Sequence, residues 1–493
     1  MQKRLRRRRT EKPGSGGQTR KSRSRAKWMG GGVIALGLLA YGAVSLFLKD
    51  DPLPEEGSLS QAESLLFRPP TTLYQTIDPN SGAAPETVLD ARAEIIADMR
   101  AEALALVKHL MTMFPLDENA DVLQGDIYEN LREDALSMVA WKRALAKNPQ
   151  RTDLYEKLGE VAAAQGNQEQ ALAYWNQGLQ TNANAPNLRW HIANAYLEQG
   201  QPEPGVQLLT EECRLSPQTA RNYFLLGQCY RQMQQFEQAA LNYQKATEIA
   251  PDYYNAYYGL ANVCRMMKET ERAKEALEKF RALKQRADAS EDRQIKVEEM
   301  PQFRRRLAAY YIKGYQLYAQ NRKVRQGKIL LQRAAAVAPD WPMCLEKLAT
   351  HHYHINRLDE AIKFYRQAQR LDPNQPMYAV NVGTLYRQLR RYDLAEKAFR
   401  QAIRRFPDYS PGYRELIFLN MKTEKNLSQT LSLAQTAVQL KGSADDYYIL
   451  SQVHRVNGNG QAALSAIQEA IRLDPDNAEY RSYDAIIRRP GTK

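Results

Sequence analysis

Proline recurs along this chain with a period of 34. One series runs through Pro115, Pro149, Pro217 and Pro251, and a second through Pro339, Pro373, Pro407 and Pro475; every interval within a series is that period or twice it. Proline lacks the amide hydrogen that continues a helix, so it ends one helical segment and separates it from the next. A fixed period of this length indicates one supersecondary unit repeated along the chain, rather than a few unrelated globular domains.

Each repeating unit has the pattern of two amphipathic helices. In the unit 220–253, large and small residues share one face of each helix: Tyr223, Leu226, Gly227 and Tyr230 in the first, and Ala239, Tyr243 and Ala246 in the second. The small residues let the two helices approach closely, and the tyrosines fill the wider gaps. Other units repeat the order, with Gly159, Ala171 and Trp175, with Ala349, Ala361 and Tyr365, and with Gly383, Tyr386, Ala395, Phe399 and Ala402.

This order of large and small residues, closed by proline, resembles the tetratricopeptide repeat (TPR) family. Units begin near residues 118, 152, 186, 220, 254, 308, 342, 376, 410 and 444, and 84–117 is a weaker one. The resemblance implies an all-α fold, a TPR-type superhelical solenoid of about ten to eleven helix pairs. Two units depart from the pattern, so we expect their packing to differ: Tyr315 and Ile417 stand where a small residue is expected, and Gln429 replaces an alanine.

An uncharged apolar segment, Trp28–Leu48, precedes the repeats and is bracketed by Lys27 and Lys49. As a helix it would be about 31 Å long, which matches a bilayer core of roughly 30 Å. We therefore expect a single transmembrane helix at 28–48. The alternative is a cleaved signal peptide, but no small-x-small cleavage site follows the apolar run before Lys49.

The positive charge of the chain lies almost entirely at its N-terminus. Residues 1–27 contain 12 Lys or Arg and one acidic residue, Glu11, whereas the rest of the chain has 57 Lys or Arg against 55 Asp or Glu. A nucleic-acid-binding protein would need a basic face on its folded part, so that class of protein is not expected.

The positive-inside bias predicts a basic cytoplasmic tail at 1–27 and an extracytoplasmic repeat region, periplasmic or lumenal. Alternatively, Arg6–Arg9 contacts anionic lipid or nucleic acid.

The remaining boundaries follow from composition and from the phase of the repeat. Prolines with Ser, Thr and Gly between them predict a flexible tether at 49–83. The interval from Pro251 to Pro339 is two periods plus 20, so a charged spacer interrupts the repeats. It is either a hinge or an extended helix, and we expect a partial break. The predicted order is a first TPR block at 84–287, the charged spacer at 288–307, a second TPR block at 308–477, and a capping helix and tail at 478–493.

The first helices of such a stack line a concave groove. Positions 5, 9 and 12 of each first helix form a stripe that faces this groove. In three consecutive units the stripe contains Trp190, Phe224 and Tyr258, then Asn194, Gln228 and Asn262, and finally Arg231 and Arg265. Aromatic rings give stiff contact area, amides pair with an extended backbone, and arginines favour carboxylates. We predict that these eight residues bind extended protein segments. The alternative is that the rings pack on neighbouring helices and the amides are merely solvated.

Some TPR proteins grip a C-terminal carboxylate with Lys and Asn at positions 5 and 9 of one unit. Here Glu156 and Glu160 hold those positions in the 152 unit, and Trp190 and Asn194 hold them in the next. The carboxylate clamp is therefore not matched, and recognition of chaperone tails is not predicted.

The sequence gives no positive sign of an enzyme. It contains no HExxH, phosphate-binding loop, GxSxG or dinucleotide fingerprint, so no cofactor and no small-molecule substrate is expected. His351 and His354 are one helical turn apart, but a metal site needs three or four ligands, and none is predicted. Cys213, Cys229, Cys264 and Cys344 are widely spaced and are expected to be buried thiols.

The sequence thus predicts a non-enzymatic, membrane-tethered scaffold that binds protein partners in its groove and assembles an extracytoplasmic complex. Two alternatives remain open. One is a non-catalytic accessory subunit of a membrane enzyme complex for polysaccharide synthesis or glycosyl transfer. The other is an import-receptor-like protein whose repeats face the cytosol.

Overall fold

The computed structural model describes residues 85–295 and 299–488. These ranges contain 22 α-helices and no strand. The expected basic tail, transmembrane helix and tether, at 1–27, 28–48 and 49–83, lie outside the described residues. Among the helices that are described, none combines the length and the apolar character needed to cross a bilayer.

The described helices belong to two compact parts, one ending at Leu385 and the other beginning at Tyr386. The first part contains α3 (Pro85–Met113), α4 (Glu118–Asn130), α5 (Asp134–Lys147), α6 (Thr152–Ala164), α7 (Gln168–Thr181), α8 (Leu188–Glu198), α9 (Pro202–Leu215), α10 (Ala220–Gln232), α11 (Phe236–Ile249), α12 (Tyr254–Met266), α13 (Thr270–Ile295), α14 (Glu299–Gln320), α15 (Val324–Val337), α16 (Pro342–His354) and α17 (Leu358–Leu371). Helix α18 (Pro376–Gln388) crosses the boundary. The second part continues with α19 (Tyr392–Arg405), α20 (Ser410–Thr423), α21 (Leu427–Leu440), α22 (Ala444–Val456), α23 (Gly460–Leu473) and α24 (Ala478–Ile487).

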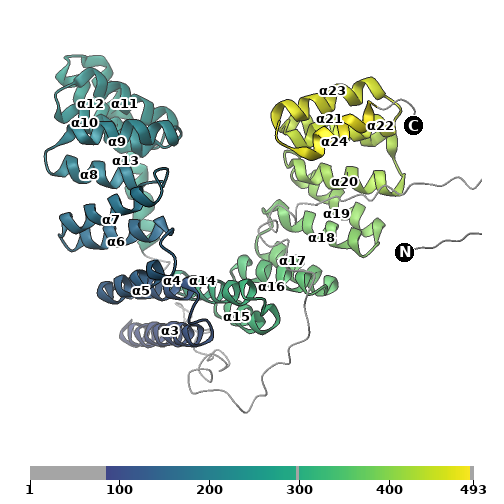
Figure 1. Cartoon of the computed structure of the whole chain (residues 1–493), viewed down its shortest axis with the longest axis horizontal. Coiled ribbons are helices and arrows are strands. Elements are labelled where there is room, and N and C mark those ends of the chain that lie inside the picture. The colour runs from purple at the N-terminus through teal and green to yellow at the C-terminus, as the bar shows by residue number, and fades with distance from the viewer. Residues whose placement is uncertain (1–84, 296–298, 489–493) are drawn as a thin grey trace, which may run out of the picture. The chain divides into compact units, whose positions relative to one another are not determined.

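Helices α4 to α23 follow one another in the order expected of ten helix pairs, which confirms the predicted all-α TPR solenoid. From α4 to α12, each helix packs on its partner and on the helix of the next pair (Figure 1). Glycines on the first helices make the close approach possible. A Cβ atom at Gly125 would lie 2.2 Å from the indole nitrogen of Trp141, and one at Gly159 would lie 2.0 Å from that of Trp175. The small-facing-large pattern in the sequence is therefore the interior packing of each pair.

The 308 unit reverses this pattern. Tyr315 is buried on its first helix, at the position where all other units except the 410 unit have a small residue. Its partner helix α15 compensates with Gly327, at which a Cβ atom would lie 3.0 Å from the Tyr315 ring and 2.7 Å from the Cβ of Tyr318. The large residue and the small residue have exchanged places between the two helices, so α14 and α15 still pack closely against each other.

The 410 unit adapts by a shift of one position. Its two helices begin at Ser410 and Leu427, one position further apart than the starts of α6 and α7 or of α10 and α11. Glu424 and Asn426 adopt left-handed backbone angles in the longer connection. The shift leaves Gln429 exposed and buries Thr430, whose hydroxyl accepts a hydrogen bond from the Asn420 amide at 3.1 Å.

In place of the weak helix pair expected at 84–117, the described residues form one long helix, α3, that ends at Met113. Helix α3 packs on α4 and also on α14, and α14 packs on α4 (Figure 1). The His109 ring nitrogen lies 2.7 Å from the Tyr318 hydroxyl, and the Lys313 ammonium forms an ion pair with Asp126 at 2.7 Å. The first helix of the second block therefore lies beside the two helices that begin the first block.

Two long helices occupy the region assigned to the charged spacer. Helix α13 extends to Ile295 and α14 begins at Glu299, so the expected block boundary at 308 lies inside α14. Residues 296–298 lie outside the described ranges. Figure 1 shows α13 running back from α12 toward α14, which returns the chain to the start of the first block. In the second part, Tyr480 of α24 packs on Ile467 and Ala470 of α23, where a capping helix was expected.

Candidate functional site

The eight predicted groove residues lie on α8, α10 and α12, three consecutive first helices, each of which contacts the next. Their aromatic members differ in exposure. Trp190 packs edge-on against His191, with ring centroids 5.1 Å apart, and the Arg221 guanidinium lies 5.0 Å from the centroid of its ring. The Phe224 and Tyr253 ring centroids are 5.2 Å apart, whereas Tyr258 is 49% exposed. Two of the three rings therefore contribute to packing between units, and Tyr258 offers the most accessible surface.

The three amides lie one turn further along the same helices. Asn194 donates to the Glu198 carboxylate at 2.7 Å, and Asn262 accepts a hydrogen bond from Arg265 at 3.4 Å. Gln228 occupies the same repeat position on α10 and is half-buried. Arg231 and Arg265 are both exposed. The partners of Asn194 and Asn262 are surface side chains of the same helix. A bound polypeptide backbone can replace such partners at little cost, because they remain solvated when displaced.

A second group of side chains lies beside the same repeat positions on the preceding first helix, α6. Glu156 and Glu160, at positions 5 and 9 of the 152 unit, face His191 at position 6 of the next. The His191 Nε2 atom lies 3.2 Å from Glu156 Oε1 and 3.5 Å from Glu160 Oε1. Sequence reasoning found the two glutamates but not His191, because position 6 lies outside the stripe of positions 5, 9 and 12.

The surroundings of this group are partly shielded from water. Burial raises the pKa of the Glu160 carboxyl, the Glu156 and Glu129 carboxylates act in the same direction, and His191 acts in the opposite one. The His191 ring stacks on Trp175, with centroids 5.0 Å apart. Trp175 also donates its indole hydrogen to the backbone oxygen of Glu156 at 3.2 Å. The two carboxyl groups and the imidazole are therefore held in a defined position on the first-helix surface.

Two of the three histidines of α16 belong to the core, and His354 is half-buried. His351 is buried, with Nδ1 3.3 Å from the Tyr315 hydroxyl, and His352 stacks on Phe364. Burial lowers the pKa of His351 to about 3. Within the described ranges, one group of three side chains brings its ligand atoms together closely enough to hold an ion, and it contains Glu156, Glu160 and His191 rather than the α16 histidines.

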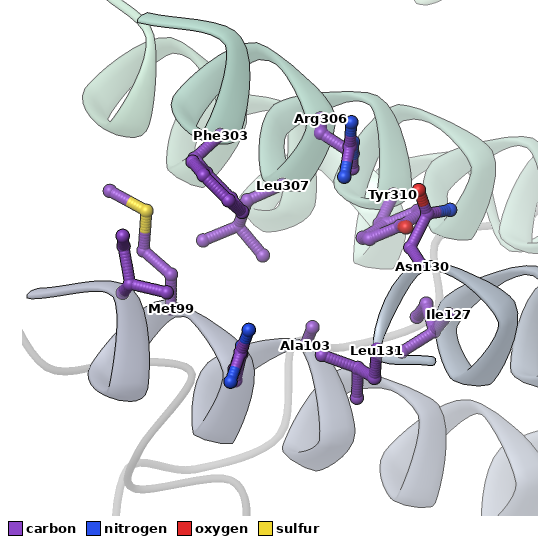
Figure 2. Close-up of a pocket in the computed structure, with 11 residues that line it drawn as sticks. Met99, Ala103, Ile127, Asn130, Leu131, Phe303, Arg306, Leu307 and Tyr310 are labelled. Carbon is purple, nitrogen blue, oxygen red and sulfur yellow. The ribbon is translucent and has the colours of Figure 1, made fainter. Parts of the chain in front are cut away.

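The cavity between α3, α4 and α14 is too small for a metabolite. Figure 2 shows Met99 and Ala103 facing Phe303, Leu307 and Tyr310 across it. Its volume is about 40 Å³, which leaves room for a few water molecules at most. A larger hollow of about 340 Å³ lies between α4, α6 and α14.

The charges that line this larger hollow are already paired. The Asp126 carboxylate forms ion pairs with Lys157 at 3.1 Å and with Lys313 at 2.7 Å. Arg151 likewise forms an ion pair with Asp153 at 2.7 Å. The charged lining is therefore accounted for by contacts within the protein.

Comparison with known protein families identifies the repeats. A model described as TPR repeat matches residues 227–265, and two described as tetratricopeptide repeat match residues 134–189 with 305–376 and residues 378–409. No curated protein matches the chain.

Several solved structures are similar to this chain at low sequence identity. Yeast Tom70 is 12% identical, and the match covers 75% of this chain and 88% of that one, with a TM-score of 0.33. PilW, described as a widely conserved type IV pilus biogenesis factor, is 16% identical (54% and 97% covered, TM-score 0.28). MamA from Desulfovibrio magneticus RS-1 is 19% identical (34% and 97% covered, TM-score 0.30). The family-model matches and the ten helix pairs together show that this chain contains tetratricopeptide repeats folded as a superhelical solenoid.

Proposed function

We propose that this protein is a non-enzymatic, membrane-tethered scaffold that binds extended segments of partner proteins along α8, α10 and α12, and so assembles a complex outside the cytoplasm. The observation that carries the proposal is the register of Asn194, Gln228 and Asn262. They recur once per repeat on three first helices, each in contact with the next. A row of side-chain amides can donate to and accept from an extended backbone, whatever the sequence of the bound segment.

The charges beside this row favour an acidic segment. Arg231 and Arg265 are both exposed at the α10–α12 end. Exposed guanidinium groups pair with carboxylates in bidentate geometry and are readily available to a partner. The exposed Tyr258 ring adds stiff apolar contact area on α12. The bound segment therefore places Asp, Glu or a terminal carboxylate near α10 and α12.

The membrane tether rests on the sequence. Residues 28–48 are uncharged and long enough to span a bilayer as a helix, and the basic residues before them favour a cytoplasmic N-terminus. A reporter fused after Lys493 tests this topology. Activity of a reporter that folds only outside the cytoplasm is expected, whereas activity of a cytosolic reporter favours the import-receptor-like alternative. Deleting residues 1–48 is expected to release the repeats from the membrane fraction.

Partner binding is tested by crosslinking in the native membrane, followed by quantitative mass spectrometry. In the test variant Asn194, Gln228 and Asn262 are all replaced by Ala, which removes the row of amides. The matched control replaces three exposed amides on the second helices α7 and α11, which are Gln177, Gln180 and Gln238. We expect the test variant to lose its crosslinked partners while circular dichroism stays unchanged, and the control to retain them. Equal recovery of partners by both variants would contradict groove binding.

A further inference from the structure

The ligand atoms of Glu156, Glu160 and His191 lie close enough together to bind one metal ion. All three ligand atoms lie within 4.8 Å of one another, and His191 Nε2 is 3.2 Å and 3.5 Å from the two carboxylate oxygens. Two ligand atoms on a tetrahedral ion, each about 2.0–2.1 Å from it, are separated by about 3.3 Å. We propose that these three residues bind a divalent transition-metal ion of the zinc type.

The fold holds the three ligands in place. Glu156 and Glu160 are four positions apart on α6, so they project from one face of the helix. His191 comes from α8, and its ring lies between Trp175, which stacks on it, and Trp190, which meets it edge-on. Two indoles thus restrict the imidazole before any ion binds. Ligands positioned in advance lose little conformational entropy on binding, which favours a defined site over chance capture.

The charge of the group favours a cation. Within the described part of the chain, neither Glu156 nor Glu160 has a Lys or Arg ion pair, and their one basic neighbour within 4.0 Å is His191. The nearby lysine, Lys157, contacts Asp126 and Glu129 instead. A divalent ion would offset the negative charge of the two carboxylates.

The donor set selects the type of ion. Zinc accepts both imidazole nitrogen and carboxylate oxygen, the two ligand types present here, whereas Mg²⁺ and Ca²⁺ prefer oxygen ligands alone. Three protein ligands leave a fourth position for water or for a group from a partner. The side chain of His191 is 11% exposed and that of Glu160 is 49% exposed, so an ion can enter past Glu160. This inference does not depend on the proposed groove binding.

The test is a calorimetric titration of the full-length chain with zinc sulfate. The chain is purified without a polyhistidine tag, stripped of metal and held at pH 7.5. We expect one Zn²⁺ per chain with a micromolar or lower Kd, no comparable binding of Mg²⁺, and at least tenfold weaker Zn²⁺ binding at pH 5.5, where protons compete for the ligands. Absence of a stoichiometric Zn²⁺ site at pH 7.5 would overturn the proposal.

Variants locate the site. Glu160→Gln keeps the shape of a half-exposed side chain, so it is expected to fold normally and to weaken Zn²⁺ binding at least tenfold, as is His191→Ala. Glu169→Gln removes the same charge from an exposed position on α7, and His354→Ala removes a histidine of α16; both are expected to bind Zn²⁺ like the wild type. If Glu160→Gln binds as tightly as the wild type, or His354→Ala abolishes binding, the site is refuted and the three side chains only contact one another.

Discussion

Glu102 of α3 accepts a hydrogen bond at 2.6 Å from the Arg333 guanidinium of α15, although the two residues are 231 positions apart in the chain. Both side chains are almost fully buried, at 7% and 8% exposure. The Tyr311 hydroxyl of α14 also donates to this carboxylate. The buried group therefore joins α3, the helix that begins the first block, to α14 and α15, the first helix pair of the second.

Removing one member of this pair should destabilise the junction strongly. Arg333→Met takes the cation away from the buried Glu102 carboxylate, and Glu102→Leu takes the anion away from the buried guanidinium. Each is expected to lower the free energy of unfolding by about 3–5 kcal/mol, whereas the double variant should recover much of the loss. Denaturant titration followed by circular dichroism measures these changes.

An exposed ion pair provides the control for this comparison of single and double variants. Arg305 of α14 lies 3.3 Å from Asp340, and both side chains are about half-exposed. Arg305→Ala is therefore expected to cost less than about 1 kcal/mol. Losses of equal size for Arg305→Ala and Arg333→Met would show that the buried pair has no special part in joining the blocks.

The glycines beneath the buried tryptophans give a second prediction. In Gly125→Ala the new methyl group overlaps the Trp141 ring, which is fully buried. Such overpacking typically costs about 1–3 kcal/mol, so the thermal midpoint should fall. Gly460→Ala is the control, since nothing lies within 4 Å of its Cβ position and its helix gains from alanine. A control variant that loses as much stability as Gly125→Ala would contradict this explanation.

The repeat itself could be predicted because its signals are local. Proline spacing and the small-facing-large order act within a single unit, and they are sufficient to predict the ten helix pairs. The departures at Tyr315 and Gln429 could be noticed but not resolved. Their compensation requires knowing that Gly327 faces Tyr315, and that a left-handed turn shifts α21 by one position.

Contacts between segments that are far apart in the chain leave no comparable signal in the local sequence. Nothing in the local sequence of α3 indicates that Glu102 meets Arg333, or that α14 returns to α4. The same limit applies to the candidate site. Helical periodicity places Phe224 on a stripe, but its packing on Tyr253 and the meeting of His191 with Glu156 depend on how neighbouring units stack.

His351 should make stability depend on pH. Burial lowers its pKa to about 3, and positive neighbours act in the same direction: His352, Lys328, His354 and Arg357. In the unfolded chain the pKa is about 6.5, so between pH 6.5 and 3 the unfolded state binds more protons than the folded state. Stability contributed by the neutral ring is therefore present above pH 6.5 and is lost as the pH falls, by about 2 kcal/mol at pH 5.

The variant His351→Gln isolates this contribution. It is expected to be less stable than the wild type at pH 7, because the buried ring is lost, but to lose less stability between pH 7 and pH 5. Urea titrations of both proteins at the two pH values measure the difference. Parallel pH dependence would show that His351 is not the group responsible.

The four cysteines should be unreactive while the protein is folded. All are buried, and burial raises the pKa of Cys213 to about 12, of Cys229 to about 11 and of Cys344 to about 12, and also raises that of Cys264. Because the thiolate is the reactive form, a disulfide reagent at pH 8 is expected to modify these thiols slowly in the native protein and rapidly in guanidinium chloride. Rapid modification of the native protein would mean that a helix carrying one of these thiols opens easily. Slow modification would let the thiols stay reduced in the oxidising compartment to which we propose that the chain is exported.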